Sequence, residues 1–337
     1  MKGNNFFIQQ YHGLSYNHGG VGYSDMEKIL VANGYLPLNA DGNSMQSGQS
    51  TAGRLVRCIR LAFSVPRNAV VVFIYPMYAR MSRLLIRILL TRGIRCQCIL
   101  ADIDGVKDGD PVLLENELNW LGRFRDFIVH NPVMETWLRA RLGEKVFSPL
   151  QFFDFLSAPA SGTREKSATI VFAGNLGKSG FLRGLDHPAL ASVHFNLYGP
   201  GQPQDLPITS LVTYKGAYPP YELVNLLEGS YGLVWDGESI HGPAGGLGIY
   251  MGLISQHKLS LYILAGLPVI INSTAACAGV VVSEGIGLAC DDLTRLPGIL
   301  ASVTDQQYAS MREKMIPFAQ RISSGRQLTD ALKKISH

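Results

Sequence analysis

Residues 232–272 read GLVWDGESIHGPAGGLGIYMGLISQHKLSLYILAGLPVIIN, and this stretch decides the fold. It begins with the pattern of a buried strand and continues through a glycine-rich loop. A predicted helix follows, with Lys258 and Ser260 at its start, and it ends at Gly266 before another apolar strand. A helix that connects two apolar strands in this way is typical of a parallel α/β sheet.

The same alternation of strands and helices extends over the whole chain. Apolar runs predict strands at 4–10, 69–75, 95–101 and 126–130, and then at 168–174, 193–199, 210–216, 231–236 and 267–272. Residues 148–167, rich in Pro, Ser and Gly, indicate a linker. We therefore predict an α/β protein with two Rossmann-like domains that face a central cleft. The predicted domains are 1–155 and 165–320, followed by a carboxy-terminal helix at 321–337 that crosses back to the first domain.

The composition fits two globular domains. The chain has 337 residues, of which 47% are hydrophobic and 17% are charged. No window reaches the roughly 18 apolar residues of a membrane span, and the amino terminus lacks the features of a secretion signal. The five cysteines are odd in number and lack CxxC spacing, which indicates reduced thiols in the interior. We therefore expect a cytoplasmic protein.

Positive charge is concentrated in the first half of the chain. Residues 1–150 contain 17 Lys and Arg against 12 Asp and Glu, whereas the remainder contains 13 against 14. Arg80, Arg83 and Arg87 recur at helical spacing beside Leu84 and other apolar residues, so this helix could rest on an anionic surface such as the inner face of the cell membrane. The alternative is a helix that covers the sheet and has a solvated basic face. Aromatic residues are not interleaved with the charges, which argues against nucleic-acid binding.

The segment FAGNLGKSG, 172–180, resembles two phosphate-binding motifs without matching either. Gly177-Lys178-Ser179 lacks the P-loop glycine five residues earlier, because Phe172 stands there. Gly174, Gly177 and Gly180 have the spacing GxxGxxG, which differs from the GxGxxG of dinucleotide-binding folds. A glycine-containing turn from strand to helix remains, with a lysine that could bind a diphosphate.

Carboxylates follow two of the predicted strands. Asp102 and Asp104 form an Asp-x-Asp pair, which is too short a motif to predict a metal site and could equally cap a turn. Asp236 and Glu238 follow a strand of the second domain. Asp236 could bind the hydroxyl groups of a sugar, or both residues could cap the loop.

Seven segments in the same order resemble bacterial β-1,6-galactofuranosyltransferases of O-antigen assembly. They are LADIDG (100–105), IVHNP (128–132), FAGNLGK (172–178), FNLYG (195–199), YKGAY (214–218), GLVWDGES (232–239) and HKLSLYILAGLPVI (257–270). The chain also resembles, more distantly, the adhesin-modifying glucosyltransferases of bacteria. The resemblance implies a GT-B glycosyltransferase that uses a UDP-sugar, needs no metal ion or other cofactor, and forms homo-oligomers.

The resemblance also implies roles for individual residues. Asn175 and Lys178, next to Gly174, would approach the diphosphate of the donor, and Tyr218 would approach the nucleotide. Lys258 and Ser260 would contact the phosphates. The loop with Gly19 and Gly20 would face the donor from the first domain. Donor-binding residues predicted from motif and resemblance together are Gly19, Gly20, Gly174, Asn175, Lys178, Tyr218, Asp236, Lys258 and Ser260.

We expect the protein to transfer galactofuranose from UDP-galactofuranose to a hydroxyl group of a bacterial surface glycan, an O-antigen or exopolysaccharide that can be lipid-linked. Transfer would proceed with inversion and without a metal ion, with Asp102 as the base. One alternative is a donor such as UDP-glucose or another UDP-hexopyranose. Similar sequences have His before this aspartate, whereas this chain has Ala101. That difference raises a second alternative, an inactive subunit that only binds a nucleotide sugar.

Overall fold

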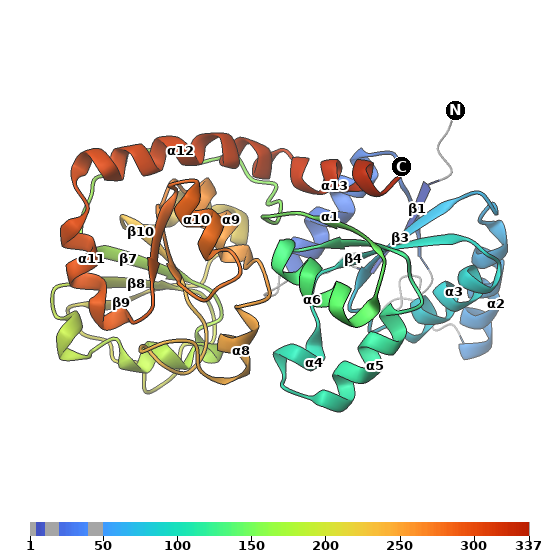
Figure 1. Ribbon diagram of the computed structural model, residues 1–337, viewed down its shortest axis with the longest axis horizontal. Coiled ribbons are helices and arrows are strands. Elements are labelled where there is room, and N and C mark those ends of the chain that lie inside the picture. Colours follow the sequence, from blue (N-terminus) through green and yellow to red (C-terminus); the bar gives the residue numbers. More distant parts are fainter. Residues whose placement is uncertain (1–4, 11–19, 40–49, 337) are drawn as a thin grey trace. The chain divides into compact units, whose positions relative to one another are not determined.

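The computed structural model describes residues 5–10, 20–39 and 50–336, which divide into two compact units. Unit 1 contains the described residues up to Val106, together with Asp110–Leu150 and 328–336. Unit 2 contains Lys107–Gly109 and Gln151–Gln327. Each unit has one sheet with helices on both sides (Figure 1). The α/β class predicted from the sequence is confirmed.

Unit 1 has a six-stranded parallel sheet in the order β2-β1-β3-β4-β5-β6. Its strands are β1 (Asn5–Ile8), β2 (Leu36–Leu38), β3 (Val70–Tyr75), β4 (Arg95–Leu100), β5 (Asp126–Val129) and β6 (Val146–Pro149). Its helices are α1 (Gly20–Ala32), α2 (Thr51–Ser64), α3 (Arg80–Thr91), most of α4 (Asp104–Lys107), α5 (Pro111–Leu121), α6 (Pro132–Leu142) and most of α13 (Arg326–Ser336).

The helices of unit 1 begin where the sequence provides caps. Asp110 and Asn131 accept hydrogen bonds from backbone N–H groups of α5 and α6, and a proline follows each cap. Such caps satisfy donors that have no partner within the helix. Between the helices, β3 reads VVVFIY and is buried on both faces, as parallel strands covered by helices are.

Unit 2 has a second six-stranded parallel sheet, in the order β12-β11-β10-β7-β8-β9. Its strands are β7 (Thr169–Ala173), β8 (His194–Tyr198), β9 (Val212–Gly216), β10 (Tyr231–Val234), β11 (Val269–Asn272) and β12 (Gly287–Cys290). Its helices are α7 (Pro220–Leu226), α8 (Gly245–Tyr250), α9 (His257–Leu264), α10 (Ala278–Ser283), α11 (Leu296–Ser302) and α12 (Asp305–Ser323). Phe172, Phe181 and Trp235 are fully buried in its core.

Three sequence interpretations are corrected by the structure. Residues 146–149 form strand β6, although Ser148 and Pro149 were assigned to the linker. The glycine-rich loop after β10 contains the short helix α8. The carboxy-terminal helix expected from residue 321 begins later, at Arg326, because Gly325 has a φ of +72° and separates α12 from α13.

All five cysteines are buried and unpaired with one another, as predicted. Burial raises the pKa of the Cys96 thiol to about 12 and those of Cys277 and Cys290 to about 11. These thiols are therefore protonated near neutral pH. Within the described residues, no helix is both long and apolar enough to span a bilayer.

We expect a thiol-specific reagent at pH 8 to label the native protein very slowly, because the reactive thiolate is scarce and shielded. The same reagent should label five thiols once the protein is unfolded in denaturant. The measurement is the absorbance change of a disulfide-exchange reagent. Rapid labelling of one thiol in the native protein would contradict the burial.

Candidate functional site

Most of the donor-site residues predicted for unit 2 lie at one edge of its sheet. Gly174 follows β7, Tyr218 follows β9 and Asp236 follows β10. The strands β10, β7, β8 and β9 are parallel neighbours, so their carboxyl ends lie at the same edge. Open α/β sheets bind their ligands at this edge.

Lys258 lies in the first turn of α9, and its ammonium group has three neighbours. The Nζ atom is 2.8 Å from Asp236 Oδ1, 3.2 Å from the Trp235 carbonyl oxygen and 4.4 Å from the centroid of the Phe172 ring. The side chain is only 13% exposed. A carboxylate and an aromatic face therefore hold this cation in one position. Asp236, which was expected to bind sugar hydroxyls, engages Lys258 through Oδ1.

Helix α9 is fixed to the sheet by Tyr262, one turn after Lys258. The Tyr262 ring lies against Gly232 of β10, where an added Cβ would be only 2.2 Å from the ring. The Tyr262 hydroxyl accepts a hydrogen bond of 2.8 Å from the backbone N–H of Ala173. The same packing that joins α9 to two strands therefore positions Lys258.

The segments that follow β7 and β8 pack backbone against backbone. Gly199 has a φ of +132°, and a Cβ there would lie 1.8 Å from the Gly174 carbonyl oxygen. The N–H of Leu176 donates to the Pro200 carbonyl oxygen at 2.9 Å. Only glycine fits such a close approach at this backbone conformation. Asn175 remains exposed on this turn.

The segment after β7 does not form the helix that we predicted. It forms two 3₁₀ turns, Leu176–Lys178 and Gly180–Gly184. Three glycines disfavour an α-helix here, and Gly180 lies so close to Glu238 that a Cβ would be 1.8 Å from Oε2. The expected helix dipole is therefore absent from this turn, although Lys178 is exposed on it.

Tyr218 presents a partly exposed ring beyond the end of β9. Its side chain is 42% exposed, and its ring centroid lies 6.3 Å from that of Tyr198. Tyr198 is held by its hydroxyl, which donates to the Leu226 carbonyl oxygen and accepts from the Glu228 N–H. A fixed aromatic neighbour therefore supports the exposed ring of Tyr218.

Ser260 does not lie at the surface where a ligand could reach it. Its side chain is fully buried, and its hydroxyl donates to the Phe153 carbonyl oxygen at 2.6 Å. The predicted contact between this hydroxyl and phosphate is therefore wrong for the structure. The reason is the helical period, since Ser260 lies two residues after Lys258 and faces another direction.

Gln256 was not identified from the sequence, because a glutamine before a helix carries no motif. It is the residue that precedes α9 and it is 5% exposed. Among the described residues, neither polar atom of its side chain has a hydrogen-bond partner, and the side chain does not cap the helix. At the start of α9, beside Lys258, the side-chain amide of Gln256 therefore makes no hydrogen bond with the described residues.

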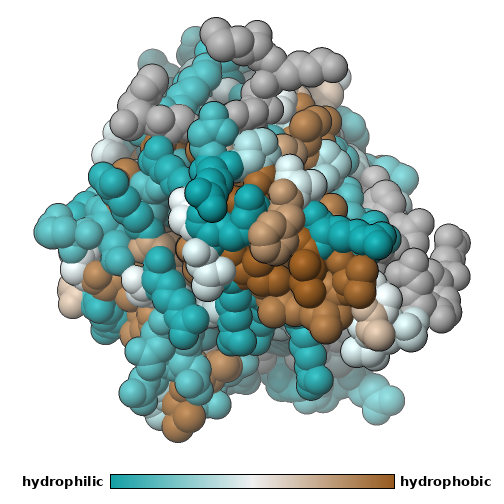
Figure 2. Space-filling view, turned by 90° about the vertical axis from the view of Figure 1, so that its right-hand side faces the viewer, coloured by the Kyte–Doolittle hydropathy of each residue, from teal (hydrophilic) through white to brown (hydrophobic). Residues whose placement is uncertain are grey.

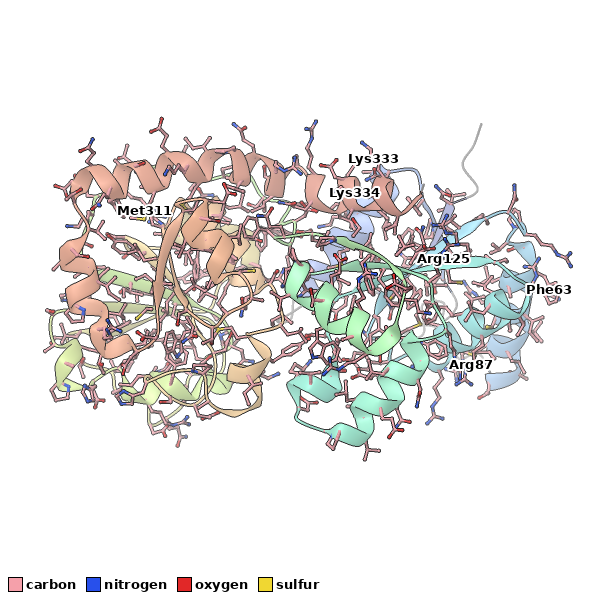
Figure 3. The ribbon with its side chains drawn as sticks, viewed as in Figure 1. Phe63, Arg87, Arg125, Met311, Lys333 and Lys334 are labelled. Atoms are coloured by element: carbon pink, nitrogen blue, oxygen red, sulfur yellow. The ribbon has the colours of Figure 1, made fainter. Side chains whose placement is uncertain are left out.

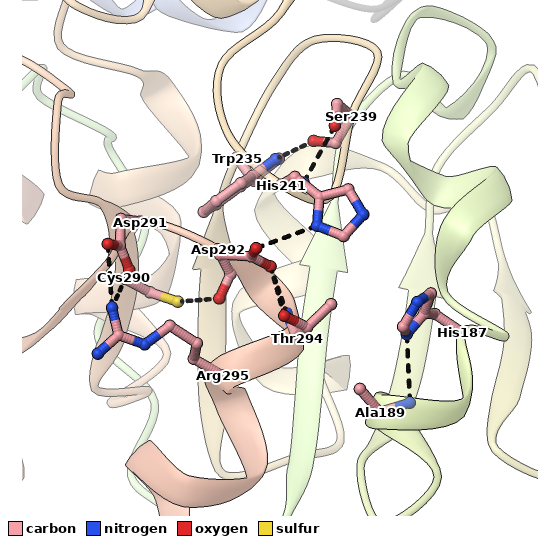
Figure 4. Close-up of polar contacts among 10 residues, drawn as sticks. All are labelled: His187, Ala189, Trp235, Ser239, His241, Cys290, Asp291, Asp292, Thr294 and Arg295. Atoms are coloured by element: carbon pink, nitrogen blue, oxygen red, sulfur yellow. Dashed lines mark hydrogen bonds and ion pairs between the residues drawn. The ribbon is translucent and has the colours of Figure 1, made fainter.

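A second polar cluster closes the loop after β10 (Figure 4). Trp235 Nε1 donates to the Ser239 carbonyl oxygen at 3.0 Å, and His241 Nδ1 lies 3.0 Å from Asp292 Oδ2. Burial raises the pKa of the Asp292 carboxyl, but hydrogen bonds from Thr294 and His241 outweigh it and leave this pKa below its ordinary value. The described residues contain no group of three His, Cys, Asp or Glu that could hold a metal ion.

In unit 1, Asp102 follows the end of β4 and is partly exposed. The backbone N–H groups of Ala101 and Asp102 both donate to the carbonyl oxygen of Tyr75, at 2.7 and 3.3 Å. Asp102 is thus fixed to the neighbouring strand β3. Gly19 lies outside the described residues, and Gly20 is the first residue of α1.

The loop after Asp102 is organised by Glu117, a buried residue of α5 that sequence patterns did not identify. Its carboxyl accepts hydrogen bonds from the Tyr75 hydroxyl at 3.0 Å, the Asp104 N–H at 3.1 Å and the Gly105 N–H at 2.7 Å. Burial raises the pKa of Glu117, and these hydrogen bonds oppose the shift. One carboxyl therefore joins the end of β3 to the loop that follows β4.

Models of two protein domains match the chain. The N-terminal domain described as glucosyltransferase 3-like matches residues 5–144, and the C-terminal domain of the same description matches 170–335. Together they cover most of the chain, and each falls largely within one of the two units.

Two characterised relatives are similar over part of their length. β-1,6-galactofuranosyltransferase WbbI of Escherichia coli K12 is 29% identical over 215 residues, which is 62% of each chain. Glucosyltransferase 3 of Streptococcus gordonii is 33% identical over 106 residues, which is 32% of this chain and 31% of that relative. The matches thus span less than two thirds of either relative.

Solved structures share the fold at low sequence identity. Anabaena Alr3699/HepE in complex with UDP and glucose has a TM-score of 0.63 at 13% identity, over 98% of this chain and 99% of that one. Trehalose-6-phosphate synthase OtsA has a TM-score of 0.59 at 9% identity, over 99% of both chains. The predicted GT-B fold, with its two Rossmann-like units, is confirmed.

We expect Gly199→Ala to lower the melting temperature by several degrees. A side chain at this φ costs about 1–3 kcal/mol, and the contact with the Gly174 carbonyl adds to that strain. Differential scanning calorimetry would measure the shift. Gly279→Ala is the matched control, because a Cβ at Gly279 has no neighbour within 4 Å and lies in helix α10. Equal melting of both variants would contradict the strain.

Proposed function

Because the chain belongs to the glucosyltransferase 3-like family, we propose that it is a glycosyltransferase that binds a UDP-linked sugar in unit 2. The observation that carries this proposal is the ammonium group of Lys258, held at the start of α9 beside the carboxyl edge of the sheet. A fixed cation at this place suits the diphosphate of a nucleotide sugar.

The phosphates would meet positive charge from two sources. Lys258 supplies a cation with a fixed position, while the exposed Lys178 supplies a second one on the turn after β7. The N-terminal backbone N–H groups of α9, which Gln256 does not cap, supply further donors. Asn175, exposed on the same turn as Lys178, adds an amide. These groups would stabilise the departing UDP without a metal ion.

The nucleotide base would rest on Tyr218. Its ring is partly exposed and is supported by Tyr198, whose own hydroxyl is held by two backbone hydrogen bonds. Stacking of a base on an aromatic ring typically contributes about 1–3 kcal/mol. Tyr218 follows β9, two strands from the strand that Gly174 follows, so the donor would extend along the sheet edge.

Galactofuranose is the donor sugar that we propose. The support is the longer of the two sequence matches, which is to a galactofuranosyltransferase. The shorter match, to a glucosyltransferase, makes UDP-glucose or another UDP-hexopyranose the second candidate. The acceptor would be a hydroxyl group of a bacterial surface glycan, as the resemblance of the sequence implies.

Asp102 would act as the base in an inverting transfer. The reaction forms a bond between the acceptor oxygen and the anomeric carbon, breaks the bond from that carbon to UDP, and moves the hydroxyl proton to the carboxylate. Asp102 is partly exposed, and two backbone hydrogen bonds to Tyr75 hold its segment. A positioned carboxylate accelerates such a step by about 10²–10⁴-fold.

A subunit that binds a nucleotide sugar without transferring it is the second candidate. The feature that favours it is Ala101, which precedes Asp102 where the resemblance of the sequence leads us to expect a histidine. Binding of UDP without turnover on any donor would support this candidate.

We expect Lys258→Ala to weaken UDP binding about tenfold to a hundredfold, because a charge-assisted contact to phosphate is lost. Isothermal titration calorimetry with UDP would measure the affinity. Lys314→Ala, which removes an exposed lysine of α12, should bind UDP as the wild type does. Lys258→Ala combined with Asp236→Ala separates loss of the cation from exposure of its counter-ion. Wild-type affinity in Lys258→Ala would remove this residue from the donor site.

We expect the protein to release UDP from UDP-galactofuranose, in the presence of lipid-linked surface glycans, at least tenfold faster than from UDP-glucose. A coupled assay for UDP would follow the reaction, and a chelator should leave the rate unchanged. Faster turnover of UDP-glucose would overturn the choice of sugar but not the site.

In the same assay, Asp102→Asn should lower the transfer rate by about 10²–10⁴-fold and leave UDP affinity unchanged. Asp108→Asn is the matched control, since Asp108 is an exposed carboxylate of the same region. Unchanged turnover in Asp102→Asn would exclude this residue as the base.

A further inference from the structure

Helix α2 exposes an apolar stripe on its outer side. Of its 14 residues only Cys58 and Ala62 are buried. The stripe consists of four exposed residues: Leu55 (42%), Val56 (47%), Ile59 (41%) and Phe63 (65%). At about 100° per residue, these four fall on one face of the helix, next to the buried side. We call them the α2 stripe.

Two figures agree with the exposure of the α2 stripe. Figure 3 shows Phe63 at the outside of unit 1. Figure 2 views the molecule from the side of α2 and α3, and it shows hydrophobic residues gathered in one area with hydrophilic residues around them. Contiguous exposed apolar residues with a polar rim are typical of an interaction surface.

Arginines border the α2 stripe on both sides. Arg57 and Arg60 follow the apolar face around α2 and line a groove on that helix. On the other side, Arg92 reaches across from the end of α3, and its guanidinium carbon lies 4.9 Å from the centroid of the Phe63 ring. The sequence from 50 to 101 contains nine arginines and no lysine, aspartate or glutamate. The three arginines found beside the stripe are therefore not accompanied by an acidic residue from this part of the sequence.

Helix α3 adds charge to this surface but no apolar stripe. Its buried side includes Leu85, Ile86 and Leu89, while Arg80 and Arg87 are exposed. Helix α3 thus fits the alternative from the sequence, a sheet-covering helix with a basic face. The apolar surface that the sequence suggested for α3 lies on α2 instead.

We propose that the α2 stripe and its arginines dock unit 1 onto a bilayer that contains anionic lipids. A helix that lies at a membrane interface inserts aliphatic and aromatic side chains between lipids and places basic side chains at the phosphates. The α2 stripe supplies the former, and Arg57 and Arg60 supply the latter. Arg92, whose guanidinium donates to the carbonyl oxygens of Ala62 and Val65, adds positive charge beside Phe63. The negative surface potential of anionic lipids attracts these arginines.

Two other occupants fit these observations less well. A second copy of the chain on the same face would bring Arg57 and Arg60 against their counterparts, and like charges repel. A nucleic acid would match the arginines, but Phe63 is the only aromatic residue of the α2 stripe, and the guanidinium of Arg92 lies over its ring. Of these three occupants, the bilayer is the one that uses both the apolar stripe and the arginines beside it.

The test is flotation of the full chain with vesicles of phosphatidylcholine alone or mixed with phosphatidylglycerol. We expect the protein to float with the mixed vesicles at least tenfold more than with neutral ones, and salt should reduce this binding. Ile59→Gln combined with Phe63→Gln should lower binding to mixed vesicles at least tenfold, because two side chains no longer insert. Arg57→Gln combined with Arg60→Gln should lower it about tenfold.

The matched controls remove side chains of the same kind, apolar or cationic, from helices α12 and α13. Ile316→Gln removes an apolar side chain of α12 that is 54% exposed. Lys333→Gln with Lys334→Gln removes two exposed cations of α13, which Figure 3 labels. Both controls should float as the wild type does. Each α2 variant alters side chains that are exposed or, for Arg57, half-buried, so its melting temperature and UDP affinity should stay close to wild-type values.

Three outcomes would overturn the proposal. One is a wild-type protein that ignores the mixed vesicles. Another is equal loss of flotation in the Lys333 and Lys334 control, which would mean that charge alone binds the vesicles. The third is a molecular mass, measured by light scattering, that falls in the Ile59 and Phe63 variant while flotation is unchanged, which would assign the stripe to a second copy.

Discussion

The contact between Tyr262 and Gly232 is the constraint on which the geometry of unit 2 depends. An aromatic ring can lie flat against a strand only where the strand has no side chain. A Cβ added at Gly232 would lie only 2.2 Å from the Tyr262 ring. The Tyr262 hydroxyl also satisfies the N–H of Ala173 in the interior, where an unpaired donor is costly. Helix α9 can therefore pack against the sheet in only one position. The same packing positions Lys258, which lies four residues before Tyr262.

Partial burial of Lys258 explains why Asp236 lies beside it. The Lys258 side chain is 13% exposed, so its ammonium group has lost much of its hydration and requires a counter-ion or a ligand nearby. Asp236 and the Phe172 ring meet that requirement. In the proposed donor complex, a diphosphate would carry more charge than one carboxylate and would attract the same cation. The exposed Lys178 can then supply the additional positive charge.

The sequence predicts the sheets better than the contacts at the site. Apolar runs such as VVVFIY in β3 can be recognised as strands from the sequence, because parallel strands are buried on both faces. Strand β6 was missed because its residues border a segment rich in proline and serine. The pairing of Lys258 with Asp236 joins residues 22 positions apart and depends on how α9 packs. Ser260 was misplaced because proximity to Lys258 in sequence does not fix the direction of a helical side chain.

Two opposing effects act on the exposed face of α2: attraction between apolar side chains and repulsion between arginines. Four large apolar residues on one exposed face favour association between copies of a protein, which lowers solubility. The arginines that surround them oppose this association, because identical basic surfaces repel each other. They do not oppose a negatively charged partner. A surface of this composition therefore discriminates by charge before its apolar side chains make contact, and the rest of unit 1 does not depend on it, since only Cys58 and Ala62 of α2 are buried.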